Sequence, residues 1–280
     1  MSKNFGLLGE HLSHTMSPYI HERLFELSNK KNDYDVFEIS REDLCNKCSF
    51  LKTLSGYNIT IPHKISIIRY IDSLDKSAKL YGVVNCVHNT DEGAIGYNTD
   101  AYGFLRALGD NKELLSKKVL LLGCGGAGTM MAFETAMAGG ELTIAVRKGS
   151  NYKARKVKSK IQSKYKNVKI NVCNFEHIDG EFDILLNSTP VGMYPNINDC
   201  LVSDEVIKNT HCIFDAIYNP SETVLISKAK QYSKIAIGGA SMLVWQAVVS
   251  HEIWDNSKYD EKDIQKLIEQ VEITVKKVFE

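Results

Sequence analysis

The sequence predicts an α/β protein of two domains, one of them doubly wound around a parallel sheet. The chain has 280 residues, enough for two ordinary domains. A continuous aliphatic run, residues 117–122, leads directly into a glycine-rich loop, as in strands of a parallel sheet covered on both faces. Strand-like and helix-like segments then alternate as far as residue 236. This alternation is typical of doubly wound domains.

The elements after residue 100 are predicted from short apolar runs separated by longer mixed segments. Each predicted strand is rich in Val, Ile and Leu, which favours burial on both faces of a sheet. We expect strands at 117–122, 142–146, 168–172, 182–186 and 212–216, and helices at 129–137 and 153–164. These elements define a domain over residues 101–239.

The first hundred residues alternate in the same way and predict a second α/β domain, completed by residues 240–280. Ser17 is a good N-cap and Pro18 fits the first turn of a helix. Ile20, Leu24 and Leu27 then form an apolar face at helical spacing. We expect strands at 5–8, 34–37, 57–59 and 84–88, mainly helix from 240 onwards, and a charged amphipathic helix at 258–280.

Composition excludes several function classes. Lys plus Arg and Asp plus Glu number 34 each, which argues against nucleic-acid or membrane-surface partners. No apolar run approaches the roughly 20 residues that span a bilayer. Seven cysteines without a disulfide spacing, and no apolar signal segment, predict a cytoplasmic protein. Cys45 and Cys48 have no second pair at zinc spacing, so we expect helix residues and no metal.

A glycine-rich motif predicts a dinucleotide site between a strand and a helix. Glycines allow a tight turn, close approach of the backbone to a pyrophosphate, and free N–H groups at the helix N-terminus. The next strand ends in Arg147 and Lys148, with no carboxylate. A basic turn there favours the 2′-phosphate of NADP, and a solvated basic turn is the alternative. The predicted residues of the motif are Gly123, Gly125, Gly126, Ala127 and Gly128.

Seven short motifs stand in a fixed order along the chain, and with them it resembles the shikimate dehydrogenases over residues 5–254. They are GEHLSHTMSP at 9–18, NITIPHK at 58–64, VVN at 83–85, GYNTD at 96–100, NSTPVGM at 187–193, DAIYNP at 215–220 and GASMLVWQ at 239–246.

The resemblance implies a fold, a reaction and a set of site residues. It implies an N-terminal substrate domain (1–100 with 240–280), an inserted Rossmann-like NADP domain (101–239) and an active site in the cleft. The reaction is the reversible reduction of 3-dehydroshikimate to shikimate by NADPH, with Lys64 and Asp100 as the catalytic pair. The matching substrate-binding positions are Thr15, Ser17, Thr60, Asn85, Tyr218 and Gln246; those on the nicotinamide side are Thr189, Met193, Gly239 and Met242.

Elementary chemistry supports two of these assignments. Thr15 and Ser17 supply two hydroxyls beside a helix N-terminus, which is a natural seat for a carboxylate. Pro62 predicts that Lys64 lies in a first helical turn, where the helix dipole disfavours an ammonium group.

The chain departs from the family pattern at three places. Thr15 stands where the family has Ser, which keeps the hydroxyl and adds a methyl group. His11 stands at a position that is commonly Pro. Residues 146–148 read Val-Arg-Lys where the family has Asn-Arg-Thr, so two cofactor contacts of the family are missing.

Two other functions remain open at this stage. One is a quinate or quinate/shikimate dehydrogenase, including one that uses NAD. The other is a non-catalytic NADP-binding sensor, although a sensor has no need of both Lys64 and Asp100. The expected partner is a small molecule, and the expected oligomeric state is monomer or homodimer.

Overall fold

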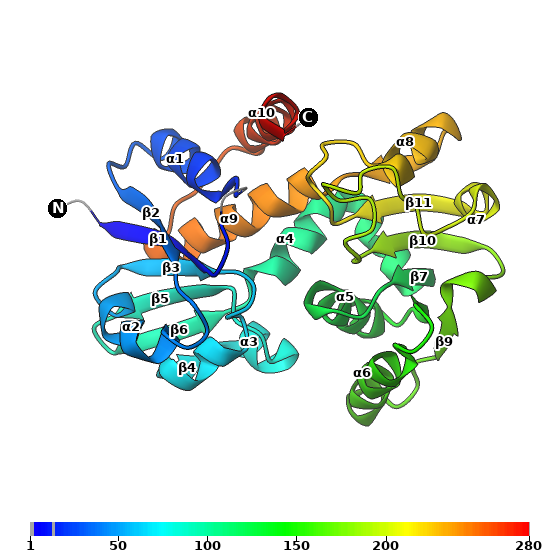
Figure 1. Ribbon diagram of the computed structural model, residues 1–280, viewed down its shortest axis with the longest axis horizontal. Coiled ribbons are helices and arrows are strands. Elements are labelled where there is room, and N and C mark those ends of the chain that lie inside the picture. The colour runs from blue at the N-terminus through cyan, green and yellow to red at the C-terminus, as the bar shows by residue number, and fades with distance from the viewer. Residues whose placement is uncertain (1–2, 13–14, 280) are drawn as a thin grey trace. The chain divides into compact units, whose positions relative to one another are not determined.

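The structure is a computed structural model that describes residues 3–12 and 15–279. The chain divides into two compact units. The first unit comprises Met1–Gly103 and Val244–Val271, and the second comprises Phe104–Leu243 and Glu272–Glu280. Each unit contains one six-stranded sheet with helices packed against it (Figure 1). The protein is therefore an α/β protein, as the sequence predicts.

The first unit is built on a mixed sheet in the order β2-β1-β3-β5-β6-β4. The pairs β1·β2, β1·β3 and β4·β6 are parallel, whereas β3·β5 and β5·β6 are antiparallel. The strands are β1 (Asn4–Gly9), β2 (Asp33–Glu38), β3 (Gly56–Ile59), β4 (Ser73–Leu74), β5 (Cys86–Thr90) and β6 (Gly93–Tyr97).

Both faces of this sheet are covered by helices. Alternate side chains of its strands point to opposite faces, so each face contributes to a different core. On one face, Phe5 and Cys86 pack with Phe25 of α1 and Trp254 of α9. On the other, the core holds Leu8 and Ile59 of the sheet with residues of α2. The helices of this unit are α1 (Ser17–Leu27), α2 (Leu44–Leu51), α3 (Lys76–Tyr81), the 3-10 helix η1 (Ser66–Tyr70) and most of α9 (Gly239–Asp255).

The second unit is built on a fully parallel sheet in the order β12-β11-β10-β7-β8-β9. Renumbered from its first strand, this is the order 3-2-1-4-5-6 of a doubly wound dinucleotide-binding sheet. The strands are β7 (Lys118–Leu122), β8 (Glu141–Val146), β9 (Ile170–Asn174), β10 (Phe182–Asn187), β11 (Thr210–Asp215) and β12 (Ile235–Ile237).

Helices lie on both faces of the parallel sheet. One core joins strand residues such as Leu120 and Leu185 to Ile207 of α7 and Leu225 of α8, and α5 and α6 lie on the opposite side (Figure 1). The fold therefore has its reversal of strand order between β7 and β10, where such sheets bind ligands. The helices of this unit are η2 (Gly109–Ser116), α5 (Gly126–Met137), α6 (Asn151–Lys164), η3 (Phe175–His177), α7 (Asp204–Lys208) and α8 (Val224–Gln231). Two helices are divided between the units: α4 (Thr99–Leu108) after Gly103, and α10 (Glu261–Phe279), most of which belongs to the first unit, after Val271.

Two local expectations about helix α1 are wrong. Met16, not Ser17, is the N-cap residue, and its side chain makes no capping hydrogen bond. Ser17 lies inside the first turn and is buried. Leu27 is 42 % exposed although its spacing predicts burial, because it lies at the end of the helix, beyond the contacts that cover Ile20 and Leu24.

Candidate functional site

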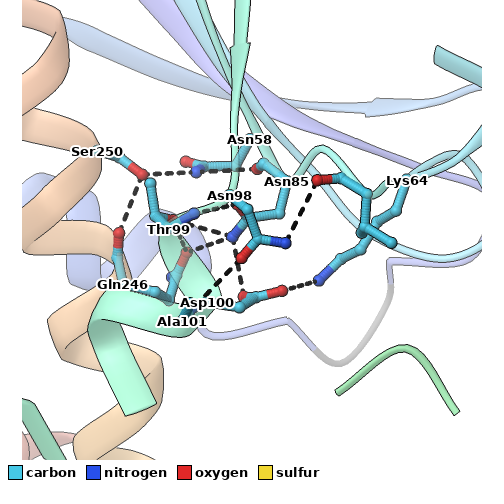
Figure 2. Close-up of polar contacts among 10 residues, drawn as sticks. Asn58, Lys64, Asn85, Asn98, Thr99, Asp100, Ala101, Gln246 and Ser250 are labelled. Carbon is cyan, nitrogen blue, oxygen red and sulfur yellow. Dashed lines mark hydrogen bonds and ion pairs between the residues drawn. The ribbon is translucent and has the colours of Figure 1, made fainter. Parts of the chain in front are cut away.

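An ion pair between Lys64 and Asp100 forms the centre of the polar site in the first unit. Lys64 Nζ lies 2.7 Å from Asp100 Oδ2 (Figure 2). Their side chains are 29 % and 19 % exposed, so both groups remain reachable while most of each is shielded. A charge-assisted hydrogen bond of this length is among the stronger polar contacts in proteins. The structure thus brings together the two residues that the resemblance identifies as catalytic.

Lys64 is held by an irregular loop and not by a helix. Residues 61–65 form turns, and η1 begins only at Ser66, so the prediction of a first helical turn at Lys64 is wrong. The cis peptide between Ile61 and Pro62 belongs to this turn. The buried His63 anchors the loop, because its Nε2 lies 2.7 Å from the carbonyl oxygen of Ile39. The Lys64 carbonyl also accepts a hydrogen bond from the Val84 N–H.

Asp100 stands in the first turn of α4 and is placed there by Asn98. The Asn98 side chain accepts a hydrogen bond from Ala101 N–H at 3.2 Å and donates to the Val83 carbonyl. An amide oxygen in this position caps the helix N-terminus. Asn98 therefore fixes the end of the helix at which Asp100 stands.

Asn85 and Gln246 lie against this pair. Asn85 Nδ2 donates to Asp100 Oδ1 at 2.8 Å and to Thr99 Oγ1 at 2.9 Å. Gln246 Oε1 accepts from Thr99 Oγ1 at 3.4 Å and from Asn85 at 3.5 Å. The two predicted substrate residues, one preceding β5 and one on α9, therefore share a network with Lys64 and Asp100 (Figure 2).

Thr15 and Ser17 lie together at the start of α1, as predicted. Thr15 Oγ1 accepts a hydrogen bond from the Ser17 N–H at 3.2 Å. The Ser17 side chain lies beside that of Tyr34, whose hydroxyl donates to Asn58 Oδ1 at 2.9 Å. Asn58 Nδ2 donates to Ser250 on α9, also at 2.9 Å. These contacts connect the beginning of α1 with the helix that carries Gln246.

The remaining substrate-binding predictions lie in two different places. Thr60 directly follows β3, and its N–H donates to the Leu8 carbonyl. Tyr218 belongs to the second unit, in the segment after β11, where burial raises the pKa of its hydroxyl.

In the second unit, the glycine-rich loop joins β7 to α5 and requires glycine for two different reasons. Gly123 has φ of +91°, and a side chain there would meet Thr189 at 2.8 Å. Gly128 packs against Ser188 with no room for a side chain. Gly125 and Gly126 instead border open space, and α5 begins at Gly126 with no side-chain cap. The open side of the loop therefore presents free helical N–H groups to an anion.

A cavity of about 290 Å³ lies beside this loop. Four of the residues that the sequence assigns to cofactor binding line it: Gly123, Gly125, Arg147 and Thr189. Arg147 Nε donates to Ser150 Oγ at 3.3 Å, which directs the guanidinium along the cavity edge. Lys153, which the sequence suggests as a support for Arg147 at the 2′-phosphate, also lines the cavity. The lining that sequence reasoning did not predict is Cys124, Val146, Ser150, Phe175, Pro190, Val191 and Leu201.

The other predicted cofactor residues do not line this cavity in the described part of the chain. Gly126, Ala127 and Gly128 form the first turn of α5. Lys148 follows Arg147 on an exposed turn, and Met193 is 43 % exposed in the segment after β10. Gly239 begins α9 pressed against the carbonyl groups of Ala216 and Ile217. Met242 is buried one turn further along α9.

Thr189 is held by a buried network at the carboxyl ends of β10 and β11. Its N–H and Oγ1 both donate to Asn187 Oδ1. Asn187 donates to Asp215, which also accepts from Thr223. Burial raises the pKa of Asp215, and three donors including the Ile217 N–H satisfy its oxygens. Asn187 and Asp215 of the family motifs therefore support the loop that carries Thr189.

The described residues also bear on metal binding, on the cysteines and on membrane-spanning helices. Among residues 3–12 and 15–279, no group of three His, Cys, Asp or Glu side chains could hold a metal ion. Cys45 and Cys48 lie on α2, as predicted, and all seven cysteines are free thiols. In the same part of the chain, no helix has the length and apolar character needed to cross a membrane.

Comparison with known proteins identifies the family. Residues 7–87 match the model of the shikimate dehydrogenase substrate binding domain. The chain is 40 % identical to the NADP(+) shikimate dehydrogenase of Methanococcus maripaludis, covering 92 % of this chain and 93 % of that protein. It is 37 % identical to that of Caldanaerobacter subterraneus, covering 92 % and 94 %.

A solved structure supports the same assignment. The shikimate 5-dehydrogenase of Thermus thermophilus, in complex with NADP(H) and shikimate, matches with a TM-score of 0.84 and 26 % identity, covering 97 % of this chain and all of that one. Two relatives this similar over nearly their full length, with the fold in common, show that the protein belongs to the shikimate dehydrogenase family.

Proposed function

We propose that this protein catalyses the reversible, NADP-dependent reduction of 3-dehydroshikimate to shikimate, with Lys64 and Asp100 as the acid–base pair. The ion pair of 2.7 Å between them carries the proposal. A binding protein without catalysis has no need to keep a half-buried lysine and carboxylate together. Asn85 and Gln246, which share their network, would bind the ring hydroxyls.

Reduction of a ketone needs a proton donor at the carbonyl oxygen. When bound, NADPH supplies the hydride to the carbonyl carbon, and negative charge then develops on the oxygen. An ammonium group has three N–H donors, and one of those on Lys64 is directed at Asp100. A second can donate its proton to the oxygen, which completes the hydroxyl of shikimate. In the reverse direction Lys64 removes this proton, while Asp100 keeps the amine in place.

The residues of the second unit fit NADP. The open side of the loop at Gly125 and Gly126 suits a pyrophosphate. Arg147, Ser150 and Lys153 at the cavity edge offer two cations and a hydroxyl and no carboxylate, which suits the 2′-phosphate. Lys148 on the adjoining turn would add a third positive charge nearby. We assign Thr189, Met193, Gly239 and Met242 to the nicotinamide side, in line with the family motifs.

Thr15 and Ser17 are the proposed seat of the substrate carboxylate. They place two hydroxyls at the uncapped N-terminus of α1, where N–H groups lack helical partners. Tyr34, which lies beside the Ser17 side chain, is itself held by its hydrogen bond to Asn58. Thr60 and Tyr218 complete the proposed set of substrate contacts.

Steady-state kinetics test this function. The expected result is reduction of NADP by shikimate, with a higher kcat/KM than for quinate, and higher with NADP than with NAD. Lys64→Ala should lose most of the turnover number and keep NADPH binding, whereas the exposed Lys47→Ala serves as the matched control. NADPH binding without turnover of either acid would instead identify a sensor. A preference for quinate would select the quinate dehydrogenase.

The cellular setting is part of the proposal. Seven free thiols support a reducing compartment, which we take to be the cytoplasm. A formal net charge of zero supports a small-molecule partner and no nucleic acid. We expect a monomer or a homodimer, which light scattering on the purified protein distinguishes.

A further inference from the structure

We infer that Thr99 is a positioning residue that orients the Asn85 amide and, through it, the Asp100 carboxylate. The inference rests on the proposed function, because it concerns the same pair. Thr99 is fully buried and therefore cannot meet a substrate itself. It is the first residue of α4, directly before Asp100. It acts through its hydrogen bonds to neighbouring side chains.

Thr99 grips Asn85 at both ends of the amide. The Thr99 N–H donates to Asn85 Oδ1 at 2.6 Å, and Thr99 Oγ1 accepts from Asn85 Nδ2 at 2.9 Å. Rotating the amide by half a turn would set Asn85 Oδ1 against the hydroxyl oxygen and Nδ2 against the N–H. The second of these contacts is donor against donor. The pair of bonds therefore selects one orientation of the Asn85 side chain.

That orientation determines how Asp100 is held. The Nδ2 group has two hydrogens, and the second is directed at Asp100 Oδ1, 2.8 Å away. The other carboxylate oxygen, Oδ2, faces Lys64 at 2.7 Å. In the opposite orientation, Asn85 Oδ1 would face the carboxylate, and two acceptors would repel each other. Thr99 thus orients the Asp100 carboxylate, which binds Lys64, indirectly through the Asn85 amide.

The hydroxyl of Thr99 also has a second contact. Because its oxygen accepts from Asn85, its own hydrogen is available for Gln246 Oε1, 3.4 Å away. The one hydroxyl therefore orients the amides of both Asn85 and Gln246 (Figure 2). The main-chain N–H of Thr99 could not orient both amides, because it donates to Asn85 Oδ1.

Two substitutions separate the hydroxyl from the shape of the residue. Thr99→Val keeps the branched shape and the backbone N–H and removes Oγ1. Thr99→Ser keeps the hydroxyl. Leaving a buried N–H of Asn85 unsatisfied should lower kcat for shikimate oxidation by about 10- to 100-fold in the Val variant. We expect the KM for NADP to change less than about 2-fold, and Thr99→Ser to recover activity to within about 3-fold of the original protein.

A double-mutant cycle distinguishes a positioning role of Thr99 from a loss of protein stability. In an Asp100→Asn background, Thr99→Val should cause little further loss of kcat, since both changes act on the same carboxylate. If the two substitutions instead lowered kcat by independent factors that multiply, the inference would be overturned. A Val variant that retains full turnover, or a Ser variant as impaired as the Val variant, would overturn it too.

The orientation of Asn85 can also be measured without turnover, which separates this inference from the proposed function. In the unliganded protein, NMR should show slow hydrogen exchange at the Asn85 side-chain amide and clearly faster exchange in Thr99→Val. Unchanged exchange would refute the positioning role even in an active enzyme. If the protein oxidises neither shikimate nor quinate but the exchange changes as expected, the proposed function fails and the positioning role stands.

Discussion

A buried pair of histidines makes the first unit sensitive to acid. His21 on α1 and His251 on α9 lie 2.9 Å apart through Nδ1 and Nε2, and His251 Nδ1 lies 2.8 Å from the Tyr259 hydroxyl. Both rings are fully buried, and the ring of His21 stacks on that of Tyr34. Each contact needs one donor and one acceptor, so a chain of two neutral rings satisfies it. The pair connects the helix that carries Ser17 with the helix that carries Gln246.

Burial keeps both rings neutral. Desolvation lowers the pKa of His251 to about 3, against a partial opposing effect of the charge on Asp255. Desolvation, followed by the proximity of His251, lowers the pKa of His21 well below its ordinary value of 6.5. Both pKa values are lower in the folded than in the unfolded chain. The stabilisation is therefore complete above about pH 6.5 and is lost as the pH falls towards the folded values.

The size of the effect follows from linkage. A histidine that stays neutral when folded loses about 1.36 kcal/mol of stability per pH unit once the unfolded form is protonated. Between about pH 7 and pH 5 this amounts to about 2 kcal/mol for one ring, and His21 adds to the loss in the same direction. That is a large part of the roughly 5–15 kcal/mol by which proteins are stable.

Urea unfolding at both pH values measures this loss. His251→Gln removes one titrating group, so its stability should fall by about 2 kcal/mol less than that of the original protein between the two pH values. His211→Gln serves as the control, because it makes the same substitution at an exposed position. If His251→Gln does not fold, His21→Gln takes its place. Identical pH dependence in the original protein and the buried-histidine variant would refute the reasoning.

Three further outcomes test the two binding sites. Arg147→Ala should raise the KM for NADP much more than that for NAD, with exposed Arg155→Ala as control; equal effects on both cofactors would contradict the assignment of the 2′-phosphate. Replacing both Thr15 and Ser17 with Ala should raise the KM for shikimate at least tenfold and leave NADPH binding intact, because a non-reacting carboxylate is held equally in ground and transition states; unchanged affinity would place the clamp elsewhere. Gly123→Ala should lower the free energy of unfolding by about 1–3 kcal/mol, since alanine is strained at positive φ; a urea midpoint unchanged from the original would show that the turn adapts.

Most of the doubly wound sheet follows from the sequence because its strands are continuous aliphatic runs. The predicted strands at 117–122, 142–146, 168–172, 182–186 and 212–216 each overlap an observed strand. Strand β6 (Gly93–Tyr97) was not predicted, since its Gly-Ala-Ile-Gly-Tyr sequence lacks an aliphatic run. Its pairing with β5 across a short turn forms it instead. Helix α3 was also not predicted; six residues between an Asp75 cap and Gly82 show no helical periodicity.

The site was predictable only where a residue occurs in a motif. Lys64, Asp100, Asn85 and Gln246 come from four motifs far apart in sequence, and the structure joins them. Tyr34 and Ser250 lie outside every motif, and a tyrosine in a predicted strand normally indicates packing. Their role follows only from hydrogen-bond partners that folding brings together.

A family motif does not by itself tell a binding residue from a supporting one. Asn187 and Asp215 end adjacent parallel strands and pair directly across them. At such ends the chain leaves the sheet, and N–H groups such as those of Thr189 and Ile217 lose their ladder partners. The two side chains accept these hydrogen bonds, and burial leaves little of either for a ligand. Thr99 and Asn98 stand in the same relation to Asp100. In both units, therefore, some polar residues of a motif face the site, and others hold those residues in place. A polar residue takes the supporting role where the turn leaves a backbone N–H without a partner in the sheet or helix and the side chain accepts its hydrogen bond.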